Sequence, residues 1–580
     1  MQVLDLDTLP TGQTLHADLV IVGGGPAGLT IAREFFGTTT QVIVIESGGR
    51  EETAEHAAMN RVEFAGTYSD LQIERRVAGH GSLAPSWSHE AQPYGVRARV
   101  LGGASQLWAG KSATYDGMDF ARRGWVPHSG WPIDREALDP YYERAATVLN
   151  LGPNIYDERL WEVIGSPPPE PAFGPELTRA FFWQFARSRT DAFDAMRFGS
   201  DFLSHQANNV RLLLHATATG IETDSEGTHV EAVRVASLGG AAARVIAPRF
   251  VLAASGIENA RLMLASNADR PEGIGNAHDV VGRYLLDHPA TQVAHFDRPA
   301  ANAIVRRFGF QGVEHRGRVH MYMHGLALAP ELQEQEGLLN AALFMLEEHA
   351  PDDPLLALKR LLRRDHSNFA GDLMTILKSP LPVAKGLGIK AFQSDRVPEK
   401  IKTALINWVV RWVPDFAVRE TLHRGVQYKL LGVRVEGITE QLPDPANRVT
   451  LSEKRDPLGV PLARIHWAVD DIARRSLARL GELMAAECAR TGLPVPELPA
   501  WITERRLQDA PVIDMAHTLG TTRMADDPRE GVVDSDCRVH GIDNLFIAGG
   551  SVIPTSGHAN PTLTILALAI RLADHLKANR

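Results

Sequence analysis

The residues best suited to chemistry gather near the C-terminal end of the chain. Between residues 516 and 562 the sequence holds many side chains that exchange protons or hydrogen bonds: His517, Thr521, Thr522, Arg523, Ser556, His558 and Asn560. An imidazole can accept a proton near neutral pH, because its unperturbed pKa is about 6.5. Asn560 and Pro561 fit the N-cap and the first position of a strongly apolar helix. Such a helix start stabilises negative charge, so this stretch predicts proton transfer next to an anion-stabilising device.

A second group of residues lies at the other end of the chain. Ala17–Glu46 has the pattern of a buried strand, a glycine turn, an amphipathic helix and a second strand that ends in an acid. In the turn, Gly23 bends the chain sharply, Gly25 lets the backbone approach a pyrophosphate, and Gly28 lets the helix pack against the strand. Glu46 would accept hydrogen bonds from a ribose hydroxyl. The stretch predicts a dinucleotide-binding unit but does not say which dinucleotide.

Three further segments are candidates for the same ligand. Arg99–Gly110 holds a glycine pair and small residues, so it can lie against a flat ligand or form an ordinary glycine-rich loop. Arg249–Gly256 and Asn544–Gly550 are each a buried strand that ends in a glycine turn. Because the carboxyl ends of parallel strands meet at one edge of a sheet, we expect the two ends of the chain to close on a single ligand.

The bulk properties set bounds on the function. A chain of 580 residues is too long for one core and should form two or more domains. Its net charge of −10 disfavours nucleic acid as a partner. Cys488 and Cys537 lie too far apart in sequence to predict a disulfide framework, and no metal-site pattern is found. The first 20 residues lack a secretory pattern, and no run of 18 apolar residues occurs, so we expect a cytoplasmic protein.

Smaller elements follow from local patterns. We expect strands at Val210–His215 and Val230–Val235 around a turn at 223–228, and a hairpin from 447–452 and 460–467. A helix should run from Asp470 to Arg490, with Cys488 in the core.

The alternating segment Gly317–Ala329 predicts a strand with two different faces. His320, Tyr322 and His324 share one face, and the methionines between them share the other. His320 and His324 could bind a metal, but we favour a polar face that lines a cavity or faces water.

Residues 354–413 are unusually basic. They hold eleven lysines and arginines against four acids, a charge of +7 in a chain whose net charge is −10. Apolar helical stripes and two tryptophans accompany these charges. Such a segment can lie in a membrane interface or dock a partner, or it can be a helical lid over the substrate cavity. We favour the lid.

These motifs together resemble the glucose–methanol–choline (GMC) oxidoreductases, which are FAD enzymes. The resemblance is carried by Ala17–Glu46, Arg99–Gly110, Val251–Arg261 and His517–Leu572. Within that family the run His-Thr-Leu-Gly-Thr-Thr-Arg-Met, followed 43 residues after His517 by Asn560, is similar to the branch of pyranose oxidases and of fructose and gluconate dehydrogenases.

The resemblance implies an α/β fold in which a Rossmann-like FAD-binding domain is interleaved with an α+β substrate-binding domain built on an antiparallel sheet. The FAD-binding domain would comprise 1–115, 205–285 and 509–580. The substrate-binding domain would comprise 116–204 and 286–508, with the basic segment as a helical insertion.

The resemblance also assigns roles to single residues. His517 and Asn560 would be the catalytic pair, with His517 taking the hydroxyl proton while the hydride passes to flavin N5. His558 departs from the residue usual in relatives and is a second candidate base. The residues expected to contact FAD are Gly23, Gly25, Pro26, Ala27, Gly28, Glu46, Ser47, Arg99, Gly102, Gly103, Ser105, Trp108, Ala216, Ala254, Gly549, Gly550, Asn560, Pro561 and Thr562.

The function implied is FAD-dependent oxidation of a CH–OH group of a sugar, glycoside or related polyol, with oxygen, a quinone or a redox protein as electron acceptor. Some relatives attach flavin covalently through a histidine where this chain has Leu107, so we expect non-covalent FAD. The alternative is a flavin-dependent lyase or photoenzyme on the same scaffold, without net alcohol oxidation.

Overall fold

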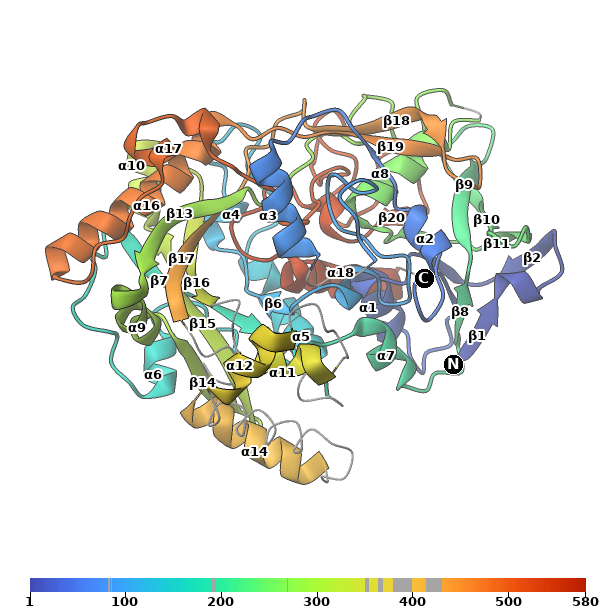
Figure 1. Ribbon diagram of the computed structural model, residues 1–580. Coiled ribbons are helices and arrows are strands. Elements are labelled where there is room, and N and C mark those ends of the chain that lie inside the picture. Colours follow the sequence, from blue (N-terminus) through green and yellow to red (C-terminus); the bar gives the residue numbers. More distant parts are fainter. Residues whose placement is uncertain are drawn as a thin grey trace.

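The computed structural model describes residues 1–579 apart from 82–83, 85, 190–193, 269, 350–353, 363–368, 379–398 and 414–429. Four sheets organise these residues (Figure 1). No helix in the described ranges is both long and apolar enough to cross a lipid bilayer.

A parallel six-stranded sheet joins stretches that lie far apart in the sequence. Its order is β1 (Gln2–Asp5), β8 (Val210–Leu214), β4 (Val42–Ile45), β3 (Leu19–Val22), β12 (Phe250–Leu252) and β20 (Leu545–Ile547). The short central strands are continuous apolar runs because both of their faces are buried. β12 lies between β3 and β20, which confirms that the glycine turns from the two ends of the chain meet at one sheet edge.

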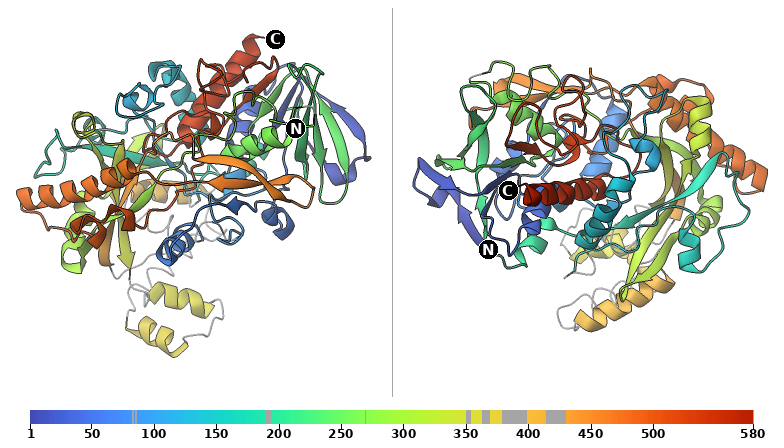
Figure 2. Two further views of the ribbon diagram at one scale, coloured as in Figure 1. Left: turned by 90° about the horizontal axis from the view of Figure 1, so that it is seen from above. Right: turned by 180° about the vertical axis from the view of Figure 1, so that it is seen from behind.

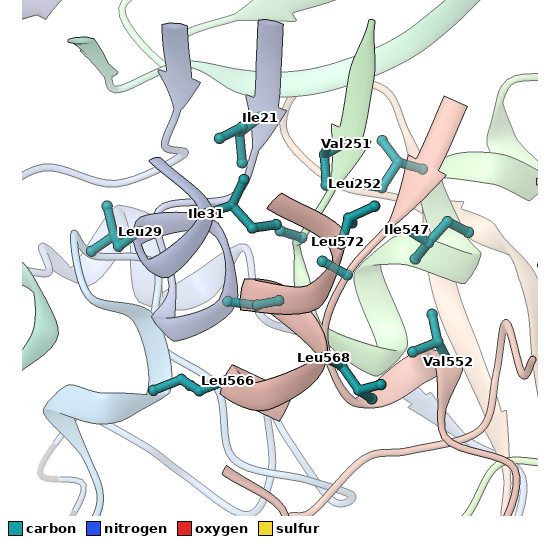
Figure 3. Close-up of a cluster of buried hydrophobic side chains, with 14 of the residues drawn as sticks. Ile21, Leu29, Ile31, Val251, Leu252, Ile547, Val552, Leu566, Leu568 and Leu572 are labelled. Atoms are coloured by element: carbon teal, nitrogen blue, oxygen red, sulfur yellow. The ribbon is translucent and has the colours of Figure 1, made fainter. Parts of the chain in front are cut away.

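Two helices cover one face of this sheet. α1 (Pro26–Glu34) follows β3 through the glycine turn, and α18 (Thr562–Ala578) packs against α1. Figure 3 shows Ile21, Val251 and Ile547 of the strands with Ile31 of α1 and Leu572 of α18, all in one buried cluster. This cluster fixes the starts of both helices at the same edge of the sheet.

A smaller four-stranded sheet has the order β2 (Gln13–His16), β11 (Ala242–Ile246), β10 (Val230–Ala236) and β9 (Thr217–Thr223). Here one sequence expectation was wrong. The strand paired with β10 across the turn at 223–228 is β9, whereas β8 belongs to the parallel sheet. The sequence of β9, TATGIET, alternates small and polar residues and carries little apolar signal.

An antiparallel sheet forms the second layer. Its order is β13 (Ala290–Asp297), β17 (Leu430–Thr439), β16 (Ala341–His349), β15 (Arg318–Leu328), β7 (Thr178–Phe185) and β6 (Lys111–Ser112), with β14 (Phe310–His315) paired to β15. α9 (Arg298–Arg307) and α16 (Asp471–Thr491) pack on one face. The other face carries Phe181, Trp183 and Phe344, which join the core of the parallel sheet. The two sheets together confirm the predicted fold class; the domain boundaries stay a prediction.

The two faces of β15 differ from expectation. His320, Tyr322 and His324 are buried and do not face water. The Tyr322 hydroxyl donates to the Pro153 carbonyl at 2.6 Å, and the His324 ring stacks on Phe182. Met323 instead pairs with Trp183 and shares its face. A histidine ring can be buried by packing against other side chains, so its polar residue type does not show that it faces a cavity or water.

The remaining elements match the local patterns more closely. β18 (Arg448–Arg455) and β19 (Pro461–His466) form the predicted hairpin, with β5 (Glu63–Phe64) beside β19. α16 begins after Asp470, whose side chain accepts from the Ala473 N–H at 2.7 Å, and Cys488 is buried. The other helices are α2 (Ala54–Ala58), α3 (Asp70–His80), α4 (Gly117–Phe120), α5 (Asp139–Leu149), α6 (Leu160–Ile164), α7 (Phe198–Leu203), α8 (Ser255–Ala265), α10 (Pro330–Glu336) and α17 (Ala500–Thr503).

Within the basic segment the structure describes three helices. These are α11 (Pro354–Leu362), α12 (Phe369–Leu377) and α14 (Glu399–Trp412). α11 and α12 pack on each other and project from the body of the protein, while α14 packs on β14 and β15 (Figure 2). The rest of the segment lies outside the described residues, so its role as a lid stays a prediction.

Candidate active site

The carboxyl edge of the parallel sheet forms a cradle lined by glycines. Gly23 has a φ of +117°, and a Cβ on Gly23 or Gly28 would collide with neighbouring backbone. At Gly25, by contrast, an added Cβ would meet no atom within 4 Å, and the same holds for Gly549. Two of the glycines are therefore required by the fold, and two leave an open backbone surface. Such a surface fits a ligand that the backbone must approach closely.

Glu46 directly follows β4 at this edge. Its carboxylate accepts from the Gly24 N–H at 2.9 Å and from the Gly48 N–H at 2.8 Å. Burial raises the pKa of Glu46 to about 7, although both backbone bonds act in the opposite direction. Behind it, the Ala216 N–H donates to the Glu46 carbonyl at 2.9 Å, and the Ser47 hydroxyl pairs with Thr217 at 2.7 Å. Glu46 is thus held rigidly at the carboxyl end of β4, and its contact with a ribose stays a prediction.

The loop from Arg99 to Gly110 runs beside the cradle. The Gly102 N–H donates to the Gly24 carbonyl at 2.7 Å, and a Cβ on Gly103 would lie 3.2 Å from Gly25 Cα. Arg99 donates to the Ser47 hydroxyl at 3.1 Å and pairs with Glu258 at 3.1 Å. This placement favours the ligand-contacting alternative for the loop.

Ser105 and Trp108 of this loop have structural partners. The Ser105 hydroxyl donates to the Gly102 carbonyl at 2.6 Å, and the Trp108 ring N–H donates to the Met196 carbonyl at 2.7 Å. Their side-chain polar groups are therefore engaged within the protein.

The far side of the cradle depends on Asn259, which the sequence analysis missed. Its side-chain oxygen Oδ1 accepts from the Ala254 N–H at 2.8 Å. Its side-chain nitrogen Nδ2 donates to the Ala548 carbonyl at 3.3 Å and to the Ser551 hydroxyl at 3.0 Å. Asn259 therefore ties the end of β12 to the turn at Gly549 and Gly550. A lone asparagine inside a helix carries no signal that would reveal this role.

The start of α18 lies one residue later than predicted. The helix begins at Thr562 with Pro561 as its N-cap, and the Asn560 side chain makes no capping bond. The Asn560 amide nitrogen lies instead 3.2 Å from Nε2 of His517. Asparagine is a common N-cap residue, but here the Asn560 side chain hydrogen-bonds to His517 and does not cap the helix.

His517 belongs to a chain of hydrogen bonds that fixes its tautomer. The Asn560 amide nitrogen is a donor, so His517 Nε2 accepts and carries no proton. His517 Nδ1 then carries the proton and donates to His288 Nδ1 at 2.8 Å. His288 Nε2 donates in turn to the Ser556 carbonyl at 3.2 Å. The assigned tautomer leaves the His517 Nε2 lone pair on the side of Asn560.

The electrostatics keep this imidazole neutral. Burial, then the neighbouring His288 and then Lys111, hold the pKa of His517 well below its usual range. Burial also lowers the pKa of His288 to about 4. Asp287 holds the backbone in place, since its Oδ1 accepts the N–H groups of His288, Met515 and His517 at 2.7, 2.9 and 3.1 Å.

Asp287, His288 and His517 present potential metal-ligand atoms within 4.8 Å of one another. Asp287 is engaged by backbone N–H groups and His288 by two hydrogen bonds, so we interpret the group as a hydrogen-bonded chain. Asp287 and His288 were not among the residues predicted from the sequence. The sequence signal that could have indicated them is an acid next to a histidine just before an expected strand.

His558 lies apart from the hydrogen-bonded group of His517, His288 and Asn560. Its ring packs edge-on against Phe181 and Trp183, with centroid distances of 4.5 and 6.3 Å. Neither ring nitrogen has a hydrogen-bond partner among the described residues. The side-chain oxygen Oδ1 of Asn560 also has none there. Burial lowers the pKa of His558 to about 3. These unpaired groups can receive polar atoms of a ligand.

Comparison with known proteins identifies the class. A family model described as GMC oxidoreductase matches residues 443–569, and curated relatives match over nearly the whole chain. The C-terminal part of the chain therefore matches the GMC oxidoreductase family, the whole chain is similar to dehydrogenases and oxidases, and the protein is an oxidoreductase.

Two relatives illustrate the match. The chain is 23% identical to the fructose dehydrogenase large subunit of Gluconobacter japonicus, over 97% of this chain and 98% of the relative. It is also 23% identical to the 2-methyl-1,2-propanediol dehydrogenase of Mycolicibacterium austroafricanum, over 97% and 95%.

A solved structure supports the fold. Pyridoxine 4-oxidase from Mesorbium loti superposes with a TM-score of 0.53 at 16% identity, covering 97% of this chain and 100% of that one. The family, and the FAD named for a structurally similar formate oxidase of Aspergillus oryzae, imply FAD as the cofactor. The open glycine surface at Gly25 and Gly549 fits it.

The pairing of His517 with His288 gives a testable pH dependence. A base must be neutral to accept a proton, so the wild-type rate of flavin reduction should fall only at pH values well below 6.5. His288→Gln removes a neighbour that lowers the pKa of His517, so the fall should begin at higher pH. It also replaces the rigid Nδ1 acceptor by a flexible amide oxygen, which positions the His517 ring less firmly, so the plateau rate should drop about tenfold.

Rapid-mixing kinetics across pH, under anaerobic conditions, measure both effects. Loss of FAD content with an unmoved pH profile would instead make His288 a purely structural residue. A wild-type profile that already falls above pH 6.5 would contradict the assigned electrostatics.

Proposed function

We propose that this protein oxidises a CH–OH group of a sugar, glycoside or related polyol to the carbonyl, with FAD as cofactor. The observation that carries the proposal is the contact of His517 Nε2 with Asn560 at the start of α18, next to the glycine cradle. A neutral base, a hydrogen-bonding amide and a helix N-terminus are the groups that removal of a hydroxyl proton needs.

The residues divide the work as follows. Glu46 and the backbone at Gly25 would hold the ribose and the pyrophosphate of FAD, and the α18 N-terminus would face its other end. Bound FAD supplies the two-electron acceptor for the hydride of the carbinol carbon. When the hydroxyl group enters between them, His517 Nε2 exchanges the Asn560 amide for the hydroxyl proton and accepts it, while Asn560 orients the same oxygen. His288 holds the protonated ring through Nδ1.

The names of the relatives support the substrate class. They refer to fructose, to a propanediol and to paromamine, and a shorter stretch is 36% identical to a C-glycoside 3-oxidase of Arthrobacter globiformis over 20% of this chain. Incubation of the FAD-loaded protein with sugars, glycosides and polyols should give products lighter by two hydrogens in mass spectrometry. Products of bond cleavage without oxidation would support the lyase alternative instead.

We expect FAD to be held without a covalent bond. Leu107, at the end of the short helical turn Gly103–Gln106, offers no nucleophilic atom to the flavin. Acid precipitation should therefore release all the flavin into the supernatant, as read by its absorbance. Flavin that stays on the protein pellet would contradict this expectation.

The expected electron acceptor is oxygen, a quinone or a redox protein. The basic segment contains a surface that would favour a quinone in a membrane. α14 buries Ile406 and Val410 against β14 and β15. Its opposite stripe, Ile401, Leu405, Trp408 and Trp412, is exposed by 56, 42, 57 and 69%. Exposed Lys400 and Arg411 lie on the same helix. This composition is typical of a helix that rests on an anionic membrane surface, where a quinone would be available.

We therefore expect the protein to co-sediment at low salt with vesicles that contain anionic lipid. Replacing both Trp408 and Trp412 by serine should weaken this binding at least about tenfold, because two exposed indoles are lost. Val495→Ser, which alters an exposed apolar residue elsewhere, is the matched control. Absence of wild-type binding to these vesicles would rule out the membrane contact. A cytoplasmic location stays a prediction.

A further inference from the structure

The residue directly before His517 has an unusual backbone conformation. Ala516 has a φ of +61°, in the left-handed region that is unfavourable for a residue with a Cβ. On both sides of it the chain pairs with one neighbouring segment, through Ile513 with Ala290 and through Leu519 with Leu286. Residues 514–518 lie between these pairs on one segment and only 287–289 on the other, so the longer segment bulges and carries His517 on the bulge. Such a conformation persists only when the surrounding structure holds it.

One support of this bulge is a buried ion pair. Asp514, at the start of the bulge, is paired with Arg76 of α3, and neither side chain is exposed to solvent. Asp514 also accepts from the Gly95 N–H at 3.2 Å and from the Tyr68 hydroxyl at 3.3 Å. The position of this carboxylate is therefore set by α3 and the residues around it.

Arg76 also organises the segment that supplies these donors. Its Nη2 donates to the carbonyls of Gln92 and Gly95 at 3.2 and 3.4 Å, and its Nε donates to Nδ1 of His89 at 3.3 Å. Its guanidinium lies 5.3 Å from the centroid of the Tyr68 ring. An arginine suits this place because its planar guanidinium presents five N–H donors in fixed directions.

The same segment supports the other carboxylate that holds the bulge. The Tyr94 hydroxyl donates to Oδ2 of Asp287 at 3.3 Å, while Oδ1 of Asp287 accepts from the N–H of His517 at 3.1 Å. Asp514 and Asp287 are thus both held by groups from 68–95. The geometry of the bulge depends on this segment.

We propose that Arg76 is a positioning residue for the oxidation. Its ion pair with Asp514 holds the bulge so that the His517 ring directs Nε2 toward Asn560 and Nδ1 toward His288. This inference rests on the proposed function for the role of His517 as the base. The effect is transmitted through Asp514 and the backbone, and a displacement of about 1 Å at a reacting group can slow a reaction about a hundredfold.

Two variants separate positioning from folding. Arg76→Met leaves a buried carboxylate without its counter-ion, so it should lower the melting temperature as well as the rate. The double variant Arg76→Met/Asp514→Asn removes both charges and keeps a side-chain oxygen for the Gly95 N–H, so it should melt close to the wild type. We expect the double variant to retain normal FAD content and to bind substrate within about threefold of the wild type, but to reduce its flavin at least about tenfold more slowly.

The matched control is Arg75→Met, at the neighbouring position of α3. Arg75 pairs with Glu436 at 2.5 Å, and α3 keeps a further attachment because the Gln72 amide donates to the Val512 carbonyl at 2.6 Å. This variant should therefore reduce its flavin at the wild-type rate. Anaerobic rapid mixing at several substrate concentrations separates the limiting rate from substrate affinity in all three variants.

A second measurement does not depend on turnover. The buried hydrogen bond from His517 Nδ1 to His288 should give a downfield imidazole N–H proton resonance, assigned by its absence in His288→Gln. The Arg76→Met/Asp514→Asn variant should shift or lose this resonance, whereas Arg75→Met should retain it.

A double variant that reduces its flavin at the wild-type rate, or that keeps the resonance unchanged, would overturn the inference. If no compound reduces the flavin of the wild type but the resonance is lost in the double variant, the proposed function fails and the positioning of His517 by Arg76 stands.

Discussion

His517→Ala should abolish reduction of the bound flavin while leaving FAD on the protein. The residue that accepts the hydroxyl proton contributes about 10²- to 10⁴-fold to the rate, and no other base lies within hydrogen-bond reach of Asn560 among the described residues. FAD should remain because the cradle around Gly25 and Glu46 makes no use of the imidazole. Anaerobic rapid-mixing absorbance measures the rate, and the flavin-to-protein absorbance ratio measures the FAD content.

The control for this variant is His466→Ala, which removes an exposed imidazole from β19. It should reduce its flavin at the wild-type rate. The parallel variant His558→Ala separates the two candidate bases. A His517→Ala protein that is reduced at nearly the wild-type rate, together with an inactive His558→Ala protein, would move the role of base to His558.

The second large effect concerns Gly25. An alanine there meets no protein atom within 4 Å, and the backbone φ of −85° is ordinary for an L-residue. Gly25→Ala should therefore fold normally but place a methyl group where the backbone has to approach the pyrophosphate. We expect FAD affinity to fall at least about a hundredfold, which corresponds to about 3 kcal/mol.

Calorimetric titration of the FAD-free protein with FAD measures this loss. The melting temperature of the FAD-free variant should equal that of the FAD-free wild type, which separates a binding defect from a folding defect. Gly124→Ala is the matched control, because Gly124 also has open space around it and an ordinary φ, and it lies outside the cradle. Full FAD affinity in Gly25→Ala would mean that the cofactor does not lie against this turn.

The cradle could be predicted because its signals are local. Gly23, Gly25 and Gly28 stand at fixed spacing between two apolar strands, and each has a distinct steric reason to be glycine. The strands at both ends of the chain can be recognised in the same way, because each is a short apolar run followed by glycine. Their meeting in one sheet follows from the rule that parallel strands present their carboxyl ends at one edge.

The support behind His517 could not be predicted from local pattern. His288 lies 229 residues away in sequence, and only the folded chain brings the two rings to 2.8 Å. The pairing of Arg76 with Asp514 could not be predicted for the same reason, because the two residues lie in segments far apart in the sequence. His320 and His324 show the opposite error, because polar side chains buried by packing look functional in the sequence.

The measurement that tests the central claim most directly is anaerobic reduction of the bound flavin by candidate substrates. Sugars, glycosides, sugar acids and polyols are mixed with the FAD-loaded protein, and the best of them is repeated with deuterium on the carbinol carbon. We expect at least one CH–OH compound to bleach the flavin absorbance fully, and deuterium to slow that step. A flavin that none of these compounds bleaches would contradict the proposal that this protein oxidises CH–OH groups at His517 and Asn560.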